Sequence, residues 1–237
     1  MSQYSLAEHV FVCVNDEHVV LLDLKQDRYW ALEAAKTAAL ADLVPGWPVH
    51  CETGAANDPG EAQEVAEALR DQGILSGSEG PGKDATPVTL LPASRELLSA
   101  DAYKRVPLGL VTVLRFIAAS VTAKLSLRLT PFERVIRKFR ARKRAGAGVS
   151  DPVDLEAARA LVQTFTRLRV FFFTSRNECL FDSLALLGFL ARHGIYADWV
   201  FGVQARPFAA HCWVQKGDIV FNDTVEHVSG YTPIMAA

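Results

Sequence analysis

The chain has 237 residues, of which half are hydrophobic and 22% are charged, and its formal net charge at pH 7 is -2. This composition predicts a packed globular protein and excludes wholesale disorder. The small net charge argues against a protein built mainly to bind nucleic acid. The first residues show no secretory signal, so we expect a cytoplasmic protein in a reducing compartment.

Three apolar, β-branched-rich runs near the N-terminus predict a small antiparallel meander. These runs are residues 10–14, 18–24 and 29–32. Turn-prone residues at 15–17 and 25–27 separate them. A helix is expected over 33–43, because a Pro-Gly pair follows it.

A second helix has clear start and stop signals. Asp58 can cap it, Pro59 suits the first helical position and Gly73 ends it. Gly, Ser and Pro are frequent in residues 76–92, which is typical of a linker. We therefore divide the chain into an N-terminal module at 1–80, a linker at 81–92 and a C-terminal domain at 93–237.

The chain beyond the linker begins with helical patterns. They cover residues 94–103, 107–129, 131–144 and 151–170. The longest apolar stretch is 107–129, but Arg115, Lys124 and Arg128 interrupt it. A membrane span needs about 20 nearly uncharged apolar residues. We therefore expect a buried helix there and no membrane span.

A run of seven basic residues without an acidic one lies in the helix expected at 131–144. They are Arg134, Arg137, Lys138, Arg140, Arg142, Lys143 and Arg144. Such a run is usually a solvated helix face. An acidic partner protein or docking on a membrane surface are the functional alternatives. Nucleic acid is disfavoured, because no aromatic platform is interleaved with the charge.

The C-terminal third contains the residues with catalytic chemistry. Residues 178–193 form a helical pattern that is apolar nearly all round, so this helix should be central and buried. Ser175 and Glu178 have the spacing of a capping box, which places Cys179 in the first turn. The unpaired amides and the positive end of the helix dipole stabilise a thiolate there and can hold an oxyanion.

Three runs after that helix predict antiparallel strands. They are residues 196–203, 209–215 and 219–223. If residues 216–218 form a three-residue hairpin loop, His211 faces Asp223 with Cβ atoms about 5 Å apart. Asp223 would fix the tautomer of His211, whose other ring nitrogen serves Cys179 as a base. A two-residue loop would instead pair His211 with Asn222, which can also orient a histidine.

Each of these three residues also has a purely structural explanation, as a core thiol, a hydrogen-bonded strand histidine or a turn-capping aspartate. Their combination favours a triad, because nucleophile, base and orienting group occur together. Cys212 should point to the opposite strand face from His211, and we interpret it as structural, like Cys13 and Cys51. No partner is evident for His227. The cysteine spacing suits no zinc ribbon, and neither a metal nor another cofactor is expected.

These motifs resemble a known family, the transglutaminase-like leader peptidases (B proteins) of lasso-peptide biosynthesis. The matching segments are Cys179-Leu180, Ser183-Leu184-Ala185-Leu186, Ala210-His211-Cys212-Trp213-Val214 and Asn222-Asp223. Some B proteins carry an N-terminal precursor-recognition element, which the module at 1–80 resembles in pattern. One departure is Cys212, where many relatives have a small residue.

The resemblance implies an α+β fold. A winged-helix-like module of a β-meander plus helices would be followed by a helical segment that leads into a transglutaminase- or papain-like domain. In that domain a central helix packs on an antiparallel sheet.

The resemblance also implies a function. The N-terminal module would add the leader of a ribosomally made precursor peptide to the meander edge as a strand. The expected leader-binding residues are Asp27, Arg28, Tyr29, Trp30, Leu32 and Leu69. The triad would cut leader from core, and a partner cyclase resembling asparagine synthetase would close the ring. Asn177 and Gln204 are candidate side-chain donors to the oxyanion.

Two other functions remain open. The same thioester could be captured by an amine, as in a transglutaminase, because that chemistry differs only in the second nucleophile. A catalytically idle adaptor that delivers the precursor to its cyclase is the other alternative. It predicts that Cys179→Ala leaves product formation unchanged.

Overall fold

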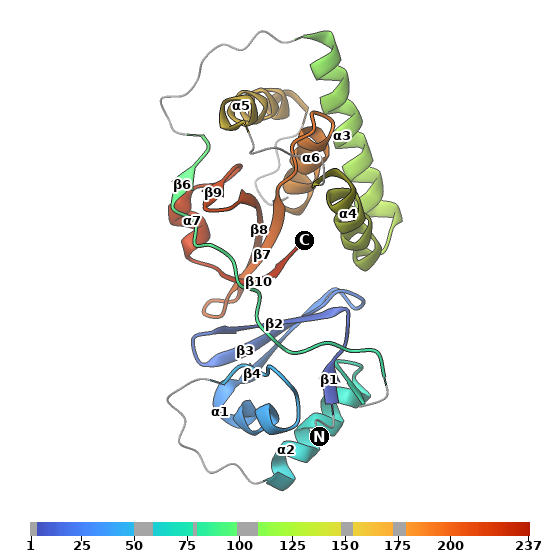
Figure 1. Cartoon of the computed structure of the whole chain (residues 1–237), viewed down its shortest axis with the longest axis vertical. Coiled ribbons are helices and arrows are strands. Elements are labelled where there is room, and N and C mark those ends of the chain that lie inside the picture. The colour runs from blue at the N-terminus through green and yellow to red at the C-terminus, as the bar shows by residue number, and fades with distance from the viewer. Residues whose placement is uncertain (1–3, 50–58, 78–79, 99–108, 148–153, 173–178) are drawn as a thin grey trace. The chain divides into compact units, whose positions relative to one another are not determined.

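The computed structural model describes residues 4–49, 59–77, 80–98, 109–147, 154–172 and 179–237 (Figure 1). The chain divides into two compact units. The first comprises Met1–Thr89, Gly202–Ala210 and Thr232–Met235, and the second comprises Leu90–Phe201, His211–Tyr231 and Ala236–Ala237.

The first unit contains the predicted three-stranded antiparallel meander. Its strands β2 (Val10–Asn15), β3 (His18–Asp23) and β4 (Arg28–Glu33) pair in the order β2-β3-β4. The first turn is tight, because Asn15 pairs with His18 and Asp16 between them adopts a φ of 52°. β4 is at the end of this order and is therefore an edge strand.

Short helices and a second sheet complete the first unit. The helix predicted at 33–43 is divided into α1 (Ala34–Thr37) and the 3-10 helix η1 (Ala38–Asp42). α2 (Pro59–Asp71) follows, and its predicted cap, Asp58, lies outside the described residues. β1 (Tyr4–Leu6) pairs with β5 (Leu75–Gly77), which the sequence did not predict because three-residue strands carry little pattern.

Part of the segment expected to be a linker is attached to the first unit. Leu6 and Lys83 exchange two backbone hydrogen bonds of 2.8 Å, and the Ala85 amide donates to the Pro45 carbonyl at 2.7 Å. Ala85 itself is buried. The domain limits inferred from composition remain a prediction.

A five-stranded sheet with the order β10-β7-β8-β9-β6 forms the centre of the C-terminal half. The strands are β6 (Arg95–Glu96), β7 (Asp198–Gln204), β8 (Ala209–Lys216), β9 (Ile219–Val220) and β10 (Thr232–Ala236). The prediction of a helix at 94–103 is wrong at Arg95–Glu96, which form the strand β6. The residues of that segment from 99 onward lie outside the described part. β6 is extended because its backbone pairs with β9 and the Arg95 guanidinium binds the Asp218 carboxylate at 2.7 and 2.9 Å.

The helices of the second unit are α3 (Leu110–Leu129), α4 (Phe132–Ala147), α5 (Leu155–Phe172), α6 (Cys179–Ala191) and α7 (Val225–Ser229). α6 packs against α3 and α5. Ring centroids of Phe116, Phe165 and Phe189, one from each of these helices, lie 5.3–6.3 Å apart. The prediction that α6 is central and buried is confirmed.

The prediction that α3 is a buried helix is wrong. Phe116, Ala119 and Ala123 on one side are buried, but Leu110 and Leu129 are 74% and 76% exposed. Among the described residues α3 is the one helix long and apolar enough to cross a membrane, and 22% of that window is buried. The helix is apolar on all sides, so packing against α6 covers only one of them.

The hairpin between β8 and β9 has a two-residue loop, the length of the second predicted alternative, but its register differs from both predicted ones. Lys216 pairs with Ile219 and Gln215 with Val220, so Gly217 and Asp218 alone form the turn. Gly217 adopts a φ of 60°, which a two-residue turn of this kind requires. In this register neither Asp223 nor Asn222 lies opposite His211 across the strand pair. β9 also ends at Val220, before either residue.

Candidate active site

Cys179 is the first residue of α6. The thiol of Cys212 donates to its sulfur and lowers its pKa most, burial opposes that effect, and His211 lowers the pKa further, to about 4. The backbone amide of Cys212 also donates to it. The N-terminal end of a helix favours a thiolate in the same direction. Cys179 is therefore ionised at neutral pH.

His211 lies on β8 and connects Cys179 to Asp223. Its Nε2 atom is 2.5 Å from Oδ2 of Asp223. Burial disfavours the charged ring, but hydrogen bonds to Asp223 and Cys179 and the negative charges of both raise its pKa to about 9. The two side chains therefore form a thiolate–imidazolium pair between about pH 4 and about pH 9.

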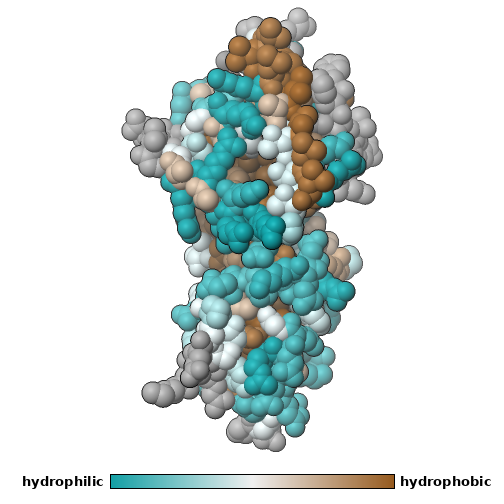
Figure 2. Space-filling view, turned by 90° about the vertical axis from the view of Figure 1, so that its right-hand side faces the viewer, coloured by the Kyte–Doolittle hydropathy of each residue, from teal (hydrophilic) through white to brown (hydrophobic). Residues whose placement is uncertain are grey.

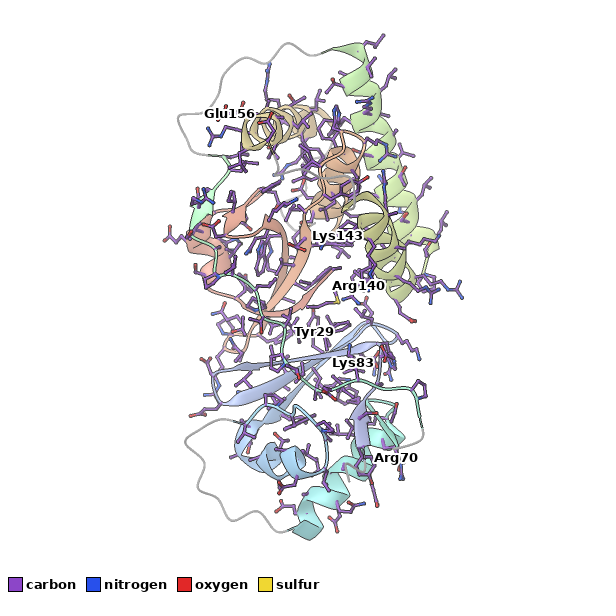
Figure 3. All side chains as sticks on the ribbon, viewed as in Figure 1. Tyr29, Arg70, Lys83, Arg140, Lys143 and Glu156 are labelled. Carbon is purple, nitrogen blue, oxygen red and sulfur yellow. The ribbon has the colours of Figure 1, made fainter. Side chains whose placement is uncertain are left out.

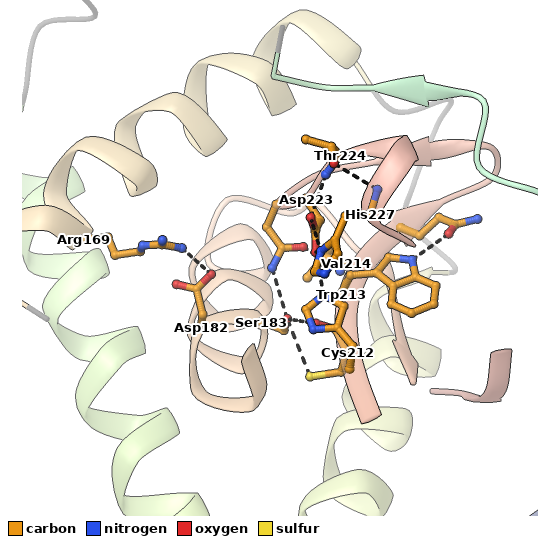
Figure 4. Close-up of polar contacts among 12 residues, drawn as sticks. Arg169, Asp182, Ser183, Cys212, Trp213, Val214, Asp223, Thr224 and His227 are labelled. Carbon is orange, nitrogen blue, oxygen red and sulfur yellow. Dashed lines mark hydrogen bonds and ion pairs between the residues drawn. The ribbon is translucent and has the colours of Figure 1, made fainter. Parts of the chain in front are cut away.

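Asp223 lies just beyond β9 and accepts hydrogen bonds from several directions (Figure 4). Its Oδ1 accepts from the Thr224 amide at 2.8 Å. Burial raises the pKa of its carboxyl, but hydrogen bonds from His211, Thr224 and His227 outweigh burial and lower it. The predicted contact between His211 and Asp223 is thus present, although it does not arise from the strand register that we expected.

His227 is a fourth member of this cluster that sequence reasoning missed. Its Nδ1 lies 2.9 and 3.0 Å from the two carboxylate oxygens of Asp223 (Figure 4), and its ring centroid is 4.7 Å from that of His211. The side chain of Thr224 caps α7 by accepting from the His227 amide at 3.2 Å. The signal in the sequence was the spacing of four residues between Asp223 and His227, which a helical turn brings together.

Cys212 is buried, as expected for a structural residue, but its side chain also hydrogen-bonds Cys179. Its carbonyl accepts from Ser183 Oγ on α6 at 3.2 Å, so the buried face of β8 brings it to the start of that helix. The hydrogen bond to Cys179 and burial raise the pKa of the Cys212 thiol well above its usual range. It therefore stays protonated and donates to the thiolate.

Asn222 joins α6 to the hairpin. Its Oδ1 accepts from the Val214 amide at 2.8 Å, and its Nδ2 donates to Ser183 Oγ at 3.1 Å. The residue that sequence analysis considered as an alternative partner of His211 therefore supports the scaffold next to Asp223.

A metal ion could be held by the same cluster. Ligand atoms of His211, Asp223 and His227 all lie within 4.8 Å of one another. Each is already engaged in hydrogen bonds with another member of the group. The donors therefore satisfy one another without an ion, and the arrangement fits a hydrogen-bonded catalytic cluster.

The two side-chain candidates for the oxyanion site remain predictions. Asn177 lies outside the described residues. Gln204 belongs to the first unit, where its side-chain amide donates to the Arg206 carbonyl at 3.3 Å. Among the described residues, the backbone amides in the first turn of α6 can serve as donors to the oxyanion.

The residues predicted to bind a leader lie mostly on β4. They are Asp27 in the preceding turn and Arg28, Tyr29, Trp30 and Leu32 on the strand. Arg28 is exposed, whereas Trp30 and Leu32 are partly buried against the core. Leu69 on α2 is 5% exposed and belongs to the core. So buried a side chain offers a bound peptide little surface, and a role of Leu69 in leader binding stays a prediction.

Comparison with known proteins found a match for the second half of the chain. The model of the transglutaminase-like superfamily matches residues 119–236, a range that contains Cys179, His211 and Asp223. Searches of curated proteins and of solved structures found no match. The match gives this part a fold of the cysteine-peptidase or acyl-transferase type. It confirms the predicted α+β fold with such a domain after the meander.

Proposed function

Because residues 119–236 form a transglutaminase-like superfamily domain, we propose that the protein is a cysteine peptidase that removes the leader from a lasso-peptide precursor. The observation that carries this proposal is that His211 hydrogen-bonds both Asp223 and Cys179, contacts that lower the pKa of the thiol and raise the pKa of the imidazole. A nucleophile, an acid–base group and an orienting carboxylate are the parts that acyl chemistry needs.

The proposed reaction begins with the ion pair already formed. The thiolate of Cys179 attacks the scissile carbonyl, and the first-turn amides of α6 stabilise the oxyanion. The imidazolium of His211 gives its proton to the departing amine, which becomes the N-terminus of the core peptide. A water molecule, deprotonated by the now neutral imidazole, hydrolyses the thioester. Asp223 keeps the ring oriented in both steps.

The proposed leader site is the exposed edge of β4. An edge strand offers unpaired amides and carbonyls to which an extended peptide can add as a further strand. Arg28 and Tyr29 lie at the start of this edge, and the side chains of Trp30 and Leu32 connect it to the core. The partner in this scheme is an asparagine-synthetase-like cyclase, which would activate a side-chain carboxyl of the core peptide and join it to the new amine. Both reactions would take place in the cytoplasm.

The test is mass spectrometry of a candidate precursor peptide incubated with wild-type protein, with Cys179→Ala and with Cys13→Ala. We expect leader and core to appear with the wild type and with Cys13→Ala, whose thiol lies in β2 of the other unit. Cys179→Ala should leave the precursor intact. Equal cleavage by Cys179→Ala would contradict the peptidase assignment, and unchanged final product in its presence would favour the adaptor.

Acyl transfer is the second candidate, because the superfamily match is shared by transglutaminases. In that reaction an amine replaces water as the acceptor of the Cys179 thioester. Adding a small primary amine to the same reaction distinguishes the two. A leader product heavier than the free acid by the mass of the amine minus that of one water indicates transfer, and free leader acid indicates hydrolysis.

A further inference from the structure

α3 carries an exposed row of aliphatic side chains. The row, called here the outer face of α3, consists of Leu110, Val111, Leu114, Val121, Leu125 and Leu129, each at least 50% exposed. Their spacing places them on one side of a helix about 30 Å long. Figure 2 shows this helix as a brown band. Six of the eleven exposed large apolar side chains among the described residues lie on this helix.

The opposite side of α3 is fixed to the protein. Phe116, Ala119 and Ala123 are buried there, and the Phe116 ring contacts Phe189 of α6 at a centroid distance of 6.3 Å. A helix held along one side by its own domain cannot pass through a bilayer alone. It can only lie flat with its outer face directed away from the domain.

Positive charge is concentrated on the same pair of helices. Residues 110–147 contain ten basic residues and one acidic residue, in a chain whose formal net charge is -2. Exposed members of this set on α3 and α4 are Lys124, Arg128, Arg134, Arg137, Lys138, Arg142 and Arg144.

Two basic residues of α4 are turned inward instead. Arg140 donates to the Ala236 carbonyl at 3.0 Å, and Lys143 donates to the Ala237 carbonyl at 3.0 Å and pairs with Asp198 (Figure 3). These contacts fix α4 to the C-terminal strand. The other basic side chains of α4 are thereby held toward solvent.

A cavity of about 190 Å³ opens between α3, α4 and α6. Its wall is mostly apolar and includes Ala123, Phe139 and Leu187, while Lys138 and Arg142 also line it. Burial and the charge of Arg142 lower the pKa of Arg192, which lines the same cavity. Apolar walls with an excess of positive charge fit an amphiphile that has a hydrocarbon chain and an anionic head.

We propose that the outer face of α3 and the exposed basic residues of α4 dock the protein on a membrane surface that contains anionic phospholipids. The aliphatic row enters the boundary between headgroups and acyl chains, and the lysine and arginine side chains meet lipid phosphates. This interaction is peripheral and adds to the proposed peptidase activity without depending on it.

The composition of the face favours lipid over a protein partner. Protein interfaces are enriched in Trp, Tyr, Phe and Met at their centres. The exposed apolar side chains of α3 are all Leu or Val. The aliphatic row of α3 and the basic side chains of the neighbouring α4 together offer the apolar burial and the positive charge that strengthen binding to an anionic leaflet.

Vesicle flotation tests this proposal with the full chain. Wild-type protein should float with vesicles of phosphatidylcholine and phosphatidylglycerol and not with vesicles of phosphatidylcholine alone. The variants Leu114→Gln/Leu125→Gln and Arg137→Glu/Lys138→Glu should each bind at least about tenfold more weakly. High salt should weaken binding of the wild type, because exposed charges are screened.

The controls are Leu91→Gln and Arg70→Glu, which alter exposed residues away from α3 and α4. They should bind as the wild type does, and thermal unfolding should show all variants folded. Wild type that fails to float with anionic vesicles, or variants that float equally well, would overturn the proposal. So would a wild-type dimer that Leu114→Gln/Leu125→Gln converts to monomer, since a second copy would then cover the face.

Discussion

The hydrogen bonds around Cys179 and His211 lower the pKa of the thiol and raise the pKa of the imidazole, which favours proton transfer to His211 before any substrate binds. The pKa of the thiol lies near 4 and the pKa of the imidazole near 9, so the thiolate–imidazolium pair is the favoured form at physiological pH. Asp223 and the Cys212 thiol each stabilise one charge of this pair. The nucleophile therefore needs no separate deprotonation step, and the acid for the leaving amine is already charged.

This charge distribution predicts the pH dependence of the site. A lowered pKa keeps Cys179 ionised above about pH 4, and a raised pKa keeps His211 protonated below about pH 9. We expect cleavage to rise through the lower value and to fall through the higher one. The rate of Cys179 alkylation by iodoacetamide, followed by mass spectrometry, should already be near its plateau at pH 6.

The matched variant for this prediction is His211→Ala. Loss of the imidazole removes one of the groups that lower the thiol pKa, so the alkylation profile should move to higher pH. An unchanged profile in that variant, or a wild-type thiol that reacts only above pH 8, would contradict the assigned pair.

His227 should act as a positioning residue through Asp223. His227→Gln removes a donor to both carboxylate oxygens, and we expect kcat to fall about tenfold, the worth of a hydrogen bond to a charged group. Asp223→Asn should cost two to four orders of magnitude, on the order seen when a triad loses its carboxylate. His193→Gln, in the turn after α6, is the control and should leave kcat unchanged.

At the scale of elements, the sequence predicted the helices and strands that carry a periodic apolar pattern. It missed the elements that form only through contacts with distant parts of the chain. The buried α6 and the β2-β3-β4 meander were predictable, because Leu180 to Leu190 and Val10 to Leu24 carry strong apolar patterns. β6 was not, because the strand depends on Asp218, more than a hundred residues away.

The candidate site was predictable in its members and not in its geometry. Cys179, His211 and Asp223 meet, but the two-residue loop sets a register that matches neither prediction, and the strand ends before Asp223. The role of His227 depends on the short helix α7, which five residues do not reveal as a pattern. The apolar sequence of α3 was correctly predicted to be a helix. Its hydrophobic pattern, however, does not show which sides of the helix are buried by other elements.

The junction between α6 and the hairpin is the element contact most open to test. Asn222→Ala leaves the buried Val214 amide without its acceptor and removes the donor to Ser183. We expect a loss of about 1–3 kcal/mol in the free energy of unfolding, measured by urea denaturation. Glu226→Ala changes an exposed residue nearby and should cost less than about 0.5 kcal/mol. Equal stability of the two variants would show that Asn222 does not hold the junction.

At the scale of the whole molecule, the proposed function assigns binding and chemistry to different parts of the chain. β4 lies in the first unit, whereas Cys179 and Asp223 lie in the second. Recognition and cleavage should therefore be separable by point substitutions in the intact protein.

We expect Cys179→Ala to bind the precursor with wild-type affinity, measured by fluorescence anisotropy of a labelled leader peptide. Arg28→Ala/Tyr29→Ala should weaken that binding at least about fivefold, since two contact side chains are lost. The same double variant should keep the wild-type alkylation rate of Cys179 at pH 6. Affinity that falls with Cys179→Ala and not with the β4 variant would place leader recognition outside the meander.

The uneven charge of the chain has a consequence for handling the protein. Residues 110–147 carry a net charge of nine positive units within a chain of formal charge -2, so the remainder is strongly acidic. Such a molecule presents opposite signs to different surfaces and should be retained at pH 7 and low salt by both cation- and anion-exchange resins. Its elution would follow the charge of whichever side faces the matrix and not the isoelectric point near 6.3, and retention on heparin would therefore say nothing about nucleic acid.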